Sequence, residues 1–494
     1  MTAELSMSTK DILQRWVPLM VSALLAACAV GPDFKRPDGP NTERYTQESQ
    51  TQTAAPADDV AQRIALGQAP PVEWWTLFQS EDLNGLMRQA VAGNNTLAAA
   101  RSTLAQAQEL LSAQTGKRYP QVTLDGGNGR QQLGAQFLGT FSIPAFTYYA
   151  VGANVSYNLD YTGGVKRSIE QQAAETEFQK HELNAAYLSL TGNVAMQFLT
   201  MASTGAQIKA VEDLLAEDRS NVDLVTSAFE AGAVTKIDVL SAQTQLAQDE
   251  TLLPPLRQQR AIARHALAIL LGQAPADGPD LALDWSRISL PRDVPVTLPS
   301  ELAHRRPDIL AAEAQLHSAT AAVGVATSNL YPKVTLSASG SQEAIKTGRL
   351  FDADSFAWSL IGGITAPLFD GGTLRAERRA TLEAVNISAA KYRQTVLQSF
   401  GQIADLLEAL SHDSELLAAQ SKALDTAHSS VDLARQSYKE GNVGVLQVLD
   451  AERQSQQARL GFLRAQAQRY MDTAQLLLAM GGAPEPELAA STTP

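Results

Sequence analysis

The sequence predicts an α+β membrane protein with an internal duplication. Each chain is expected to supply four strands to a trimeric, 12-stranded β-barrel in an outer membrane, and long helices to a coiled-coil barrel that continues it into the periplasm. Three observations support this fold: motifs that recur once at a fixed distance, two helical segments with heptad spacing, and segments in which apolar and polar residues alternate.

The chain contains two copies of one large unit. Tyr119-Pro120 returns 212 residues later as Tyr331-Pro332, and Phe229–Gly232 returns 209 residues later as Tyr438–Gly441. Such a period is longer than that of short-repeat solenoids, so we expect two large repeats, each with a helix, two strands and a long helical hairpin. In chain order we predict a signal peptide (1–27), a lipid-anchored extended segment (28–71), the first repeat (72–271), a Pro-rich linker around the equator (272–307), the second repeat (308–482) and a tail (483–494).

The amino terminus carries an export signal. Lys10 and Arg15 precede an apolar run over residues 16–27, which is too short to span a bilayer. The run closes with Leu25-Ala26-Ala27-Cys28, which resembles a bacterial lipoprotein box. Cys28 is the only cysteine among 494 residues, so it cannot form an internal disulfide. We expect it to become the mature amino terminus and to carry acyl chains such as palmitate, which anchor a chain without spanning the bilayer.

Heptad spacing predicts the long helices. The pattern places a narrow apolar stripe on each helix, as coiled-coil packing requires. The first helical pattern runs from about residue 165 to 231 without proline, or roughly 100 Å at 1.5 Å per residue. Residues seven apart occupy equivalent places in the two copies: Ile208, Leu215, Val222 and Phe229, and Leu417, Leu424, Val431 and Tyr438.

Each long helix is expected to end at a glycine turn, with tips near residues 232 and 441, because glycine suits a left-handed helix cap. Return helices are predicted over about residues 236–271 and 445–480. Pro254-Pro255 must kink or break the first of them, because proline lacks the backbone N–H that a helix interior uses.

Four segments alternate apolar and polar residues, over about residues 120–130, 148–160, 333–342 and 356–368. This alternation is typical of transmembrane barrel strands, although a half-buried soluble sheet has the same period. Four strands cannot close a barrel in lipid, where an open edge leaves backbone groups unpaired. Two chains would supply eight strands and little bore, whereas three chains would supply 12 strands and an open channel.

Composition and motifs disfavour a nucleic-acid binder and an enzyme. The net charge of -13 disfavours contact with a phosphate backbone. The sequence lacks the GxxxxGK[ST] phosphate loop and the GxSxG elbow, and its six histidines show no HExxH spacing. We therefore expect no catalysis, no cofactor and no metal site, so that energy for any transport must come from a partner.

Five segments in the chain after residue 27 carry a family resemblance: Cys28–Pro37, Trp74-Trp75, Leu298–Leu302, Arg305–Ile309 and Pro367–Gly372. Together they resemble the TolC-like outer-membrane factors, in particular the lipoprotein branch of multidrug efflux channels. The resemblance implies a homotrimeric exit duct, anchored in outer-membrane lipid, that joins a periplasmic adaptor and a proton-driven inner-membrane efflux pump.

The resemblance also implies a gate at the periplasmic helix tips. Asp450 matches one of two acidic positions of a ring that narrows this end, and Gln447 stands at the other. Tyr438 matches a tyrosine that ties the tip to the first copy, and Asp238 matches its carboxylate partner. Val443 replaces a latch arginine, so we expect fewer polar contacts at this gate.

Gly232, Gly441 and Val443 mark the tips at which an adaptor is expected to bind. Three copies of Asp450 around a threefold axis would crowd like charges and attract cations. From the residues alone, Asp450 could instead be a solvated helix carboxylate, and Tyr438 a packed residue of the heptad seam.

Two other functions fit parts of the sequence. The duct could serve an ATP-driven secretion system, or the chain could be a periplasmic coiled-coil lipoprotein scaffold that conducts nothing. Alternating strands disfavour the scaffold, and the resemblance favours efflux over secretion. A passive duct has no substrate pocket, so the sequence leaves the cargo open.

Overall fold

The structure is a computed structural model that describes residues 30–37, 42, 44–47, 61–132, 144–279, 281 and 283–481. The chain divides into two compact units, and each unit contains parts of both sequence repeats. The long helices pass from one unit into the other, so the units do not coincide with the repeats. Unit 1 comprises residues 1–37, 104–178 and 312–392, and unit 2 comprises residues 38–103, 179–311 and 393–494.

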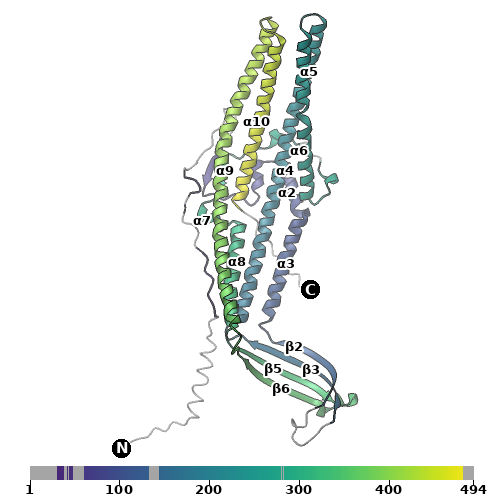
Figure 1. Cartoon of the computed structure of the whole chain (residues 1–494), viewed down its shortest axis with the longest axis vertical. Helices are drawn as coiled ribbons and strands as arrows, with labels where there is room; N and C mark the ends of the chain where they lie inside the picture. The colour runs from purple at the N-terminus through teal and green to yellow at the C-terminus, as the bar shows by residue number, and fades with distance from the viewer. Residues whose placement is uncertain are drawn as a thin grey trace, which may run out of the picture. The chain divides into compact units, whose positions relative to one another are not determined.

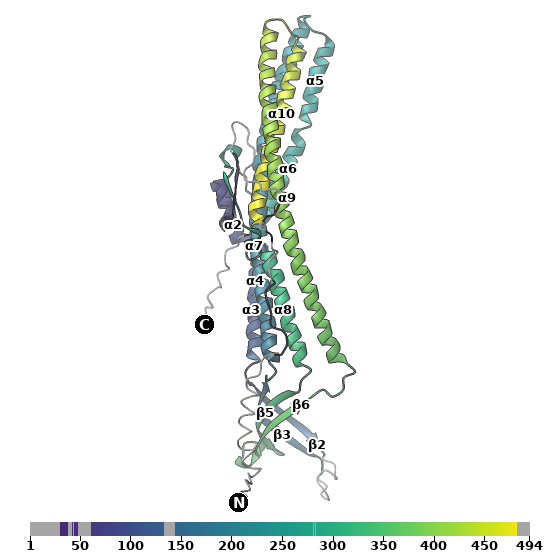
Figure 2. The ribbon, with the colours of Figure 1, turned by 90° about the vertical axis from the view of Figure 1, so that its left-hand side faces the viewer.

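Unit 1 contains a four-stranded antiparallel sheet (Figures 1 and 2). Its strands pair in the order β2 (Gln121–Gln131), β3 (Phe146–Leu159), β5 (Lys333–Ala344) and β6 (Phe356–Thr365). Strands β3 and β5 come from different repeats and pair directly, with Val155 opposite Ala338. The sheet therefore joins the two copies, and among the described residues β2 and β6 each have one free edge.

One face of this sheet is apolar and exposed in the single chain. Leu124, Trp358 and Leu360 are 79%, 73% and 74% exposed. Successive strand residues point to opposite faces, so the other face carries the alternate, mostly polar positions. A groove on that face is lined by polar side chains that include Asp125, Asn154, Ser339, Ser341 and Glu343.

The fourth strand is shorter than predicted. β6 ends at Thr365 and does not reach residue 368. Pro367 follows closely and cannot donate to a strand ladder. Gly371 and Gly372 then turn the chain with φ angles of 65° and 89°, a conformation that suits glycine. Leu368 lies beyond the strand and is 97% exposed.

Most of the described chain is helical. The two long helices, α4 and α9, have 67 residues each. As predicted, the first return helix is broken: it divides into α5 and α6 just before Pro254-Pro255, which then occupy the first turn of α6, where proline is tolerated. The second return helix, α10, is continuous. The helices are α2 (Glu81–Gly93), α3 (Asn95–Gly116), α4 (Gly164–Glu230), α5 (Lys236–Glu250), α6 (Leu253–Leu270), α7 (Pro299–Leu302), α8 (Pro307–Ser328), α9 (Thr373–Lys439) and α10 (Val445–Ala479).

Within the described part of the chain, no helix combines the length and the apolar character that crossing a bilayer requires.

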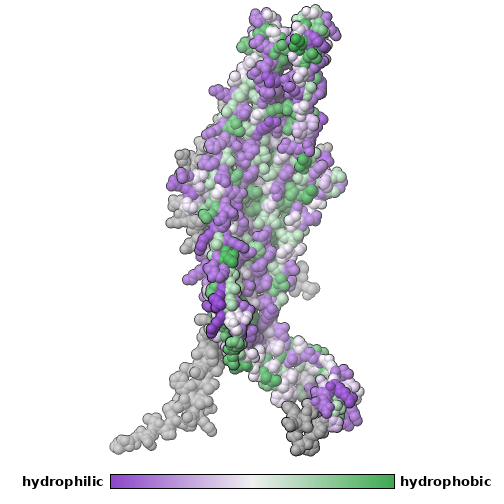
Figure 3. Space-filling model, in the orientation of Figure 1, coloured by the Kyte–Doolittle hydropathy of each residue, from purple (hydrophilic) through white to green (hydrophobic). Residues whose placement is uncertain are grey.

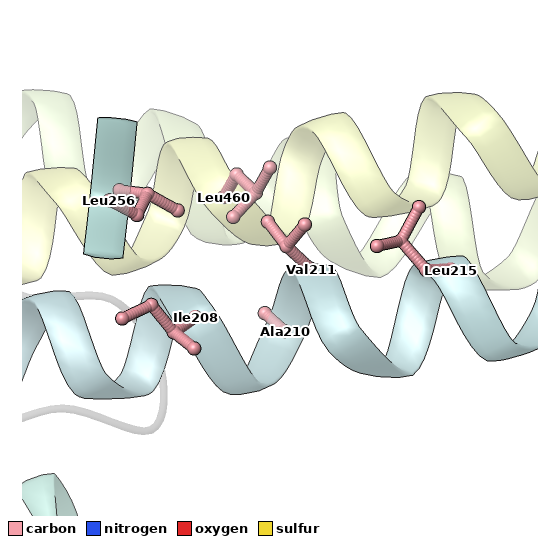
Figure 4. Close-up of a cluster of buried hydrophobic side chains, with 6 residues drawn as sticks. All are labelled: Ile208, Ala210, Val211, Leu215, Leu256 and Leu460. Atoms are coloured by element: carbon pink, nitrogen blue, oxygen red, sulfur yellow. The ribbon is translucent and has the colours of Figure 1, made fainter. Parts of the chain in front are cut away.

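The heptad seam of α4 is the core of the hairpins in unit 2. Ile208 and Leu215 of α4 are 8% and 3% exposed, and they pack with Leu256 of α6 and Leu460 of α10 (Figure 4). The seam opens toward the tip, where Phe229 is 39% exposed. On the face shown in Figure 3, hydrophilic and hydrophobic residues are interspersed over these helices.

Two segments that the sequence predicted as a tether and a linker contain a small sheet. Strand β1 (Arg63–Leu66) lies in the predicted tether and pairs in parallel with β4 (Asp293–Val296) from the linker. Val294 and Val296 are completely buried, and Arg63 forms an ion pair of 2.7 Å with Asp293. Strands of four residues are too short to produce a recognisable period, which is why the sequence did not predict them.

Equivalent hydrogen bonds join the short helix before the strands to the return helix in each repeat. Asn94 caps α3 by accepting from the Leu97 amide and donates from Nδ2 to the Leu270 carbonyl at 2.9 Å. Arg306 precedes α8 and donates from Nη1 to the Ala479 carbonyl at 3.1 Å. Each bond joins the start of a short helix to the end of a return helix. The Arg-Arg-Pro-Asp segment around Arg306 therefore has a structural role.

Candidate functional site at the helix tips

The tips of the two helical hairpins in unit 2 form the candidate site (Figure 1). Helices α4 and α5 are joined at Gly232, and α9 and α10 at Gly441, close to the predicted positions. Their φ angles are 77° and 78°, in the left-handed region that glycine adopts without strain. Both glycines are exposed, and Val443 is partly buried. The predicted adaptor-contact residues therefore lie on the two turns.

The structure does not bring the predicted Tyr438–Asp238 pair together. Oδ2 of Asp238 accepts from the Thr235 amide at 2.7 Å and from the Thr235 hydroxyl at 2.8 Å. These hydrogen bonds, the backbone one above all, lower the pKa of Asp238. Tyr438 is 39% exposed, and no hydrogen bond joins these two described residues. Asp238 instead caps the start of its own helix: it lies in the first turn of α5 and accepts from the N-cap residue Thr235, as in a capping box.

Asp450 lies near the start of α10, and its side chain is 51% exposed. Arg453 donates from Nη2 to Oδ1 at 2.5 Å, and Gln454 donates from Nε2 to Oδ2 at 2.8 Å. Both partners stand on α10 itself, three and four residues on, where side chains share a face. Gln447, at the other predicted ring position, is three residues earlier on that face. The carboxylate is therefore solvated and partly neutralised, and its place in a ring stays a prediction.

A buried glutamate, which no sequence motif predicted, joins the two hairpins. Glu452 of α10 is 8% exposed. Its Oε1 accepts from Nε of Arg435 on α9 at 2.9 Å, and its Oε2 accepts from Nδ2 of Asn221 on α4 at 2.8 Å. One carboxylate thus ties three helices from both copies. The available signal was a charged residue at the seam spacing set by Val445 and Val448, which are also buried.

A carboxyl pair lies between α4 and α5. Asp218 stands seven residues from Val211 and from Val225, two buried residues of the α4 seam, and is 9% exposed. Burial raises the pKa of Asp218 to about 7, with further contributions from a hydrogen bond to Asp249 and from the negative charges of Glu217 and Glu452. Its Oδ2 is buried and accepts no hydrogen bond. The pair therefore gains or loses a proton near neutral pH, which the sequence could not predict without knowing that Asp249 lies opposite.

Apolar contacts complete the tips. The Lys236 ammonium lies 5.7 Å from the ring centre of Phe229, a cation–π contact between the end of α4 and the start of α5. Below it, small side chains of α4, α5 and α10 are buried together: Val225, Val239, Ala242 and Val445.

Two other predictions concern residues away from the tips. Cys28, the predicted lipid site, lies outside the described residues. Over the residues that the structure does describe, no cluster of three or more histidine, cysteine or acidic side chains could hold a metal ion.

The chain is similar to known proteins along most of its length. The family described as outer membrane efflux protein matches residues 86–273 and 298–482. The chain is 28% identical over 471 residues to the solvent efflux pump outer membrane protein SrpC of Pseudomonas putida, which covers 94% of this chain and 97% of that protein. It is 26% identical over 469 residues to the outer membrane protein OprJ of Pseudomonas aeruginosa, with coverages of 94% and 95%.

Two solved structures have a similar fold. The outer-membrane channel OprN matches with a TM-score of 0.79 and 27% identity, covering 93% of this chain and 100% of that one. The open state of the MtrE outer membrane channel of Neisseria gonorrhoeae matches with a TM-score of 0.78 and 24% identity, covering 93% and 99%, and at that identity it supports the fold alone.

Proposed function

Because this chain belongs to the outer membrane efflux protein family, we propose that it is the passive exit duct of a tripartite efflux system. An inner-membrane pump and a periplasmic adaptor deliver small molecules, and the duct carries them across the outer membrane. Relatives named as solvent and toluene efflux pump proteins support a cargo of small molecules. Members of this family are transport components, and no step of this proposal requires catalysis.

The sheet of unit 1 carries the proposal. It has one exposed apolar face, one mostly polar face and two strands, β2 and β6, with free edges among the described residues. In lipid, unpaired backbone groups cost several kcal/mol each, so the edges must pair with other strands. Pairing β6 of one copy with β2 of the next closes a ring, and three copies give 12 strands around a polar lumen.

We place the gate at the helix tips. Threefold symmetry would gather three copies of Asp450, each partly neutralised by Arg453, so we expect a modest cation preference. Opening must separate the hairpins, and the hydrogen bond from Asn221 of α4 to Glu452 of α10 is one of the polar contacts that resist this. Both hydrogen bonds from Thr235 go to Oδ2 of Asp238, so a contact with Tyr438 would have to use the other carboxylate oxygen, Oδ1.

The remaining parts of the proposal concern attachment. The exposed turns at Gly232 and Gly441, with Val443 beside the second, are offered as the adaptor contact, and a lipid on Cys28 as the membrane anchor. Nothing in the sequence resembles a nucleotide-binding loop, so the energy must come from a partner. The resemblance to multidrug efflux channels favours a proton-driven pump as that partner.

Cross-linking in the native cell, followed by purification and mass spectrometry, tests the assembly, and single-channel recording of the purified protein tests conduction. The proposal expects trimers that conduct, recovered with an adaptor and a proton-driven pump. Recovery with an ATP-driven transporter would favour secretion instead. Trimers that never conduct would favour the scaffold, and a protein that stays monomeric in membranes would refute the shared barrel.

A further inference from the structure

The segment that follows the predicted lipid site is bound in a socket of unit 1. Arg167, near the start of α4, is 4% exposed. It donates from Nε to the Val30 carbonyl at 3.2 Å, and from Nη2 to the Gly31 carbonyl at 3.4 Å and the Asp33 carboxylate at 2.6 Å. Among the described residues, its one other acceptor is Glu170, at 2.7 Å from Nη1. Residues 30–33 therefore accept most of the hydrogen bonds that this buried cation donates.

The socket also fits the backbone of the segment. Gly31 has a φ of +96°, and a Cβ atom there would lie 2.5 Å from Cα of Gly324 on α8. A Cβ atom on Gly324 would lie 2.6 Å from Cγ of Arg167 and 3.0 Å from the Val30 carbonyl oxygen. Two glycines thus permit a contact that larger residues would prevent.

In addition to Asp33, which binds Arg167 of α4, the segment has two side chains with partners on α8. The Phe34 ring stacks on His317 with centroids 4.4 Å apart, and Nε2 of His317 lies 3.0 Å from Oε1 of Glu170. Arg36 donates from Nε to Glu313 at 2.6 Å, where the Glu313 side chain is only 12% exposed. Lys35, between them, is exposed and forms no ion pair with any described residue.

We propose that residues 30–36 are a docking peptide, and that the socket built around Arg167 clamps this peptide to the base of the sheet. The Val30 amide donates to the Thr162 carbonyl at 3.0 Å, in the turn between β3 and α4. Two residues span at most about 7 Å, so a lipid on Cys28 would be held beside this turn. The clamp then transmits membrane attachment to the strands. That consequence rests on the lipidation proposed above, whereas the docking itself does not.

The contacts differ in their expected contributions. The Asp33 side chain is 86% exposed, so its ion pair with Arg167 is screened by water and contributes little. The two backbone carbonyls matter more, because without them a buried guanidinium loses acceptors that water cannot easily replace. The Arg36–Glu313 ion pair should contribute more than the Asp33 pair and less than the two carbonyls, since only one of its two side chains is exposed.

Cutting the chain just after the segment tests the clamp. A protease site introduced at residues 38–41 allows cleavage after folding. Exporting residues 29–494 behind a signal peptide that is removed without lipidation leaves neither a lipid nor an apolar signal that could hold the fragment in a micelle. The measurement is the rate at which the amino-terminal fragment leaves the purified protein, followed by gel filtration and mass spectrometry. Arg36→Gln and Lys35→Gln form a matched pair, because each removes one positive charge from the fragment and leaves the socket unchanged.

We expect the wild-type fragment to remain bound after cleavage. Arg167→Gln should accelerate its release roughly 100-fold and Arg36→Gln about tenfold, which correspond to the loss of charged hydrogen bonds. Lys35→Gln should stay within about twofold of the wild type, as an exposed charge without a partner would.

The clamp is refuted if the wild-type fragment leaves as fast as the Arg167→Gln fragment, or if Lys35→Gln accelerates release as much as Arg36→Gln. Because Arg36→Gln alters only the peptide, misfolding of the socket cannot explain its effect. Conductance of the uncut protein is read separately, so a protein that retains its fragment but never conducts would refute the duct and support the clamp.

Discussion

Removing the charge of Asp218 should make the first hairpin less sensitive to pH. This aspartate lies between α4 and α5 with a pKa raised to about 7, mainly by burial, against 3.8 for an ordinary aspartate. The folded hairpin therefore binds the proton more tightly than the unfolded chain does. That stabilisation is complete below about pH 4 and is lost as the pH rises through about 7. Asp218→Asn keeps a neutral side chain of the same size that can donate to Asp249 at every pH.

The size of the effect follows from the pKa difference. A pKa difference of one between the folded and unfolded states corresponds to about 1.4 kcal/mol of stability. The raised pKa of Asp218 therefore corresponds to about 4 kcal/mol as an upper limit. Water reaches the exposed neighbouring pair of Arg219 and Glu250, whose side chains are 60% and 52% exposed, so the real contribution is smaller. We expect the wild-type hairpin to lose about 2 kcal/mol of opening free energy between pH 5 and pH 8, and Asp218→Asn to lose little.

Hydrogen exchange measured by mass spectrometry is the suitable assay, because it reports local opening of α5 even in an assembled protein. Exchange rates would be corrected for the intrinsic effect of pH and compared at pH 5, 6, 7 and 8. Asp223→Asn is the matched control, since it makes the same substitution at an exposed position of α4. If Asp218→Asn shows the same pH dependence as the wild type, or if Asp223→Asn abolishes it, the assignment of the titration to Asp218 is wrong.

Three further predictions test the tips and the sheet. Glu452→Ala should weaken the contact between the hairpins by about 1–3 kcal/mol, because Arg435 and Asn221 lose a shared acceptor. Amide hydrogen exchange should become faster at the start of α10, and an unchanged rate would mean that Glu452 does not hold the hairpins together. Asp450→Ala should lower the cation preference in bilayer recordings, and Arg453→Gln should raise it. If both variants are as selective as the wild type, this face of α10 does not line the constriction. Leu360→Arg should prevent stable membrane assembly at a cost of about 2–4 kcal/mol, while Ile361→Arg on the opposite face of β6 should still assemble. The measurement is a heat-resistant trimer band on a gel, and a band from both variants would refute the assignment of the apolar face to lipid.

Regular patterns made the larger elements predictable. The two 67-residue helices follow from heptads without proline, and their ends follow from glycines that cap helices. The break before Pro254-Pro255 follows from the missing amide of proline. The four strands of the sheet follow from alternation over about ten residues, and only the end of β6 was placed too late, because Pro367 and the glycine turn stop the ladder earlier. These features depend on residues that are close together in the sequence, so one sequence is enough to predict them.

Contacts between distant segments were not predictable in the same way. Glu452 looks like any surface glutamate until α4 and α9 bring Asn221 and Arg435 to it. Asp218 is visible as a polar residue in a seam, but its raised pKa depends on Asp249, which only the fold of the hairpin places opposite. β1 and β4 are too short to show a period, and they exist because they pair with each other.

The sequence by itself therefore determined the duplication, the long helices, the strands and, through its motifs, the family. Only the tertiary structure decided which carboxylates are buried, that Asp238 binds its own helix start rather than Tyr438, and that Arg167 holds residues 30–33. The physical reason is that backbone periodicity is a local property of the chain. The charge state and the partners of a polar side chain depend instead on burial and on groups that lie far away in the sequence.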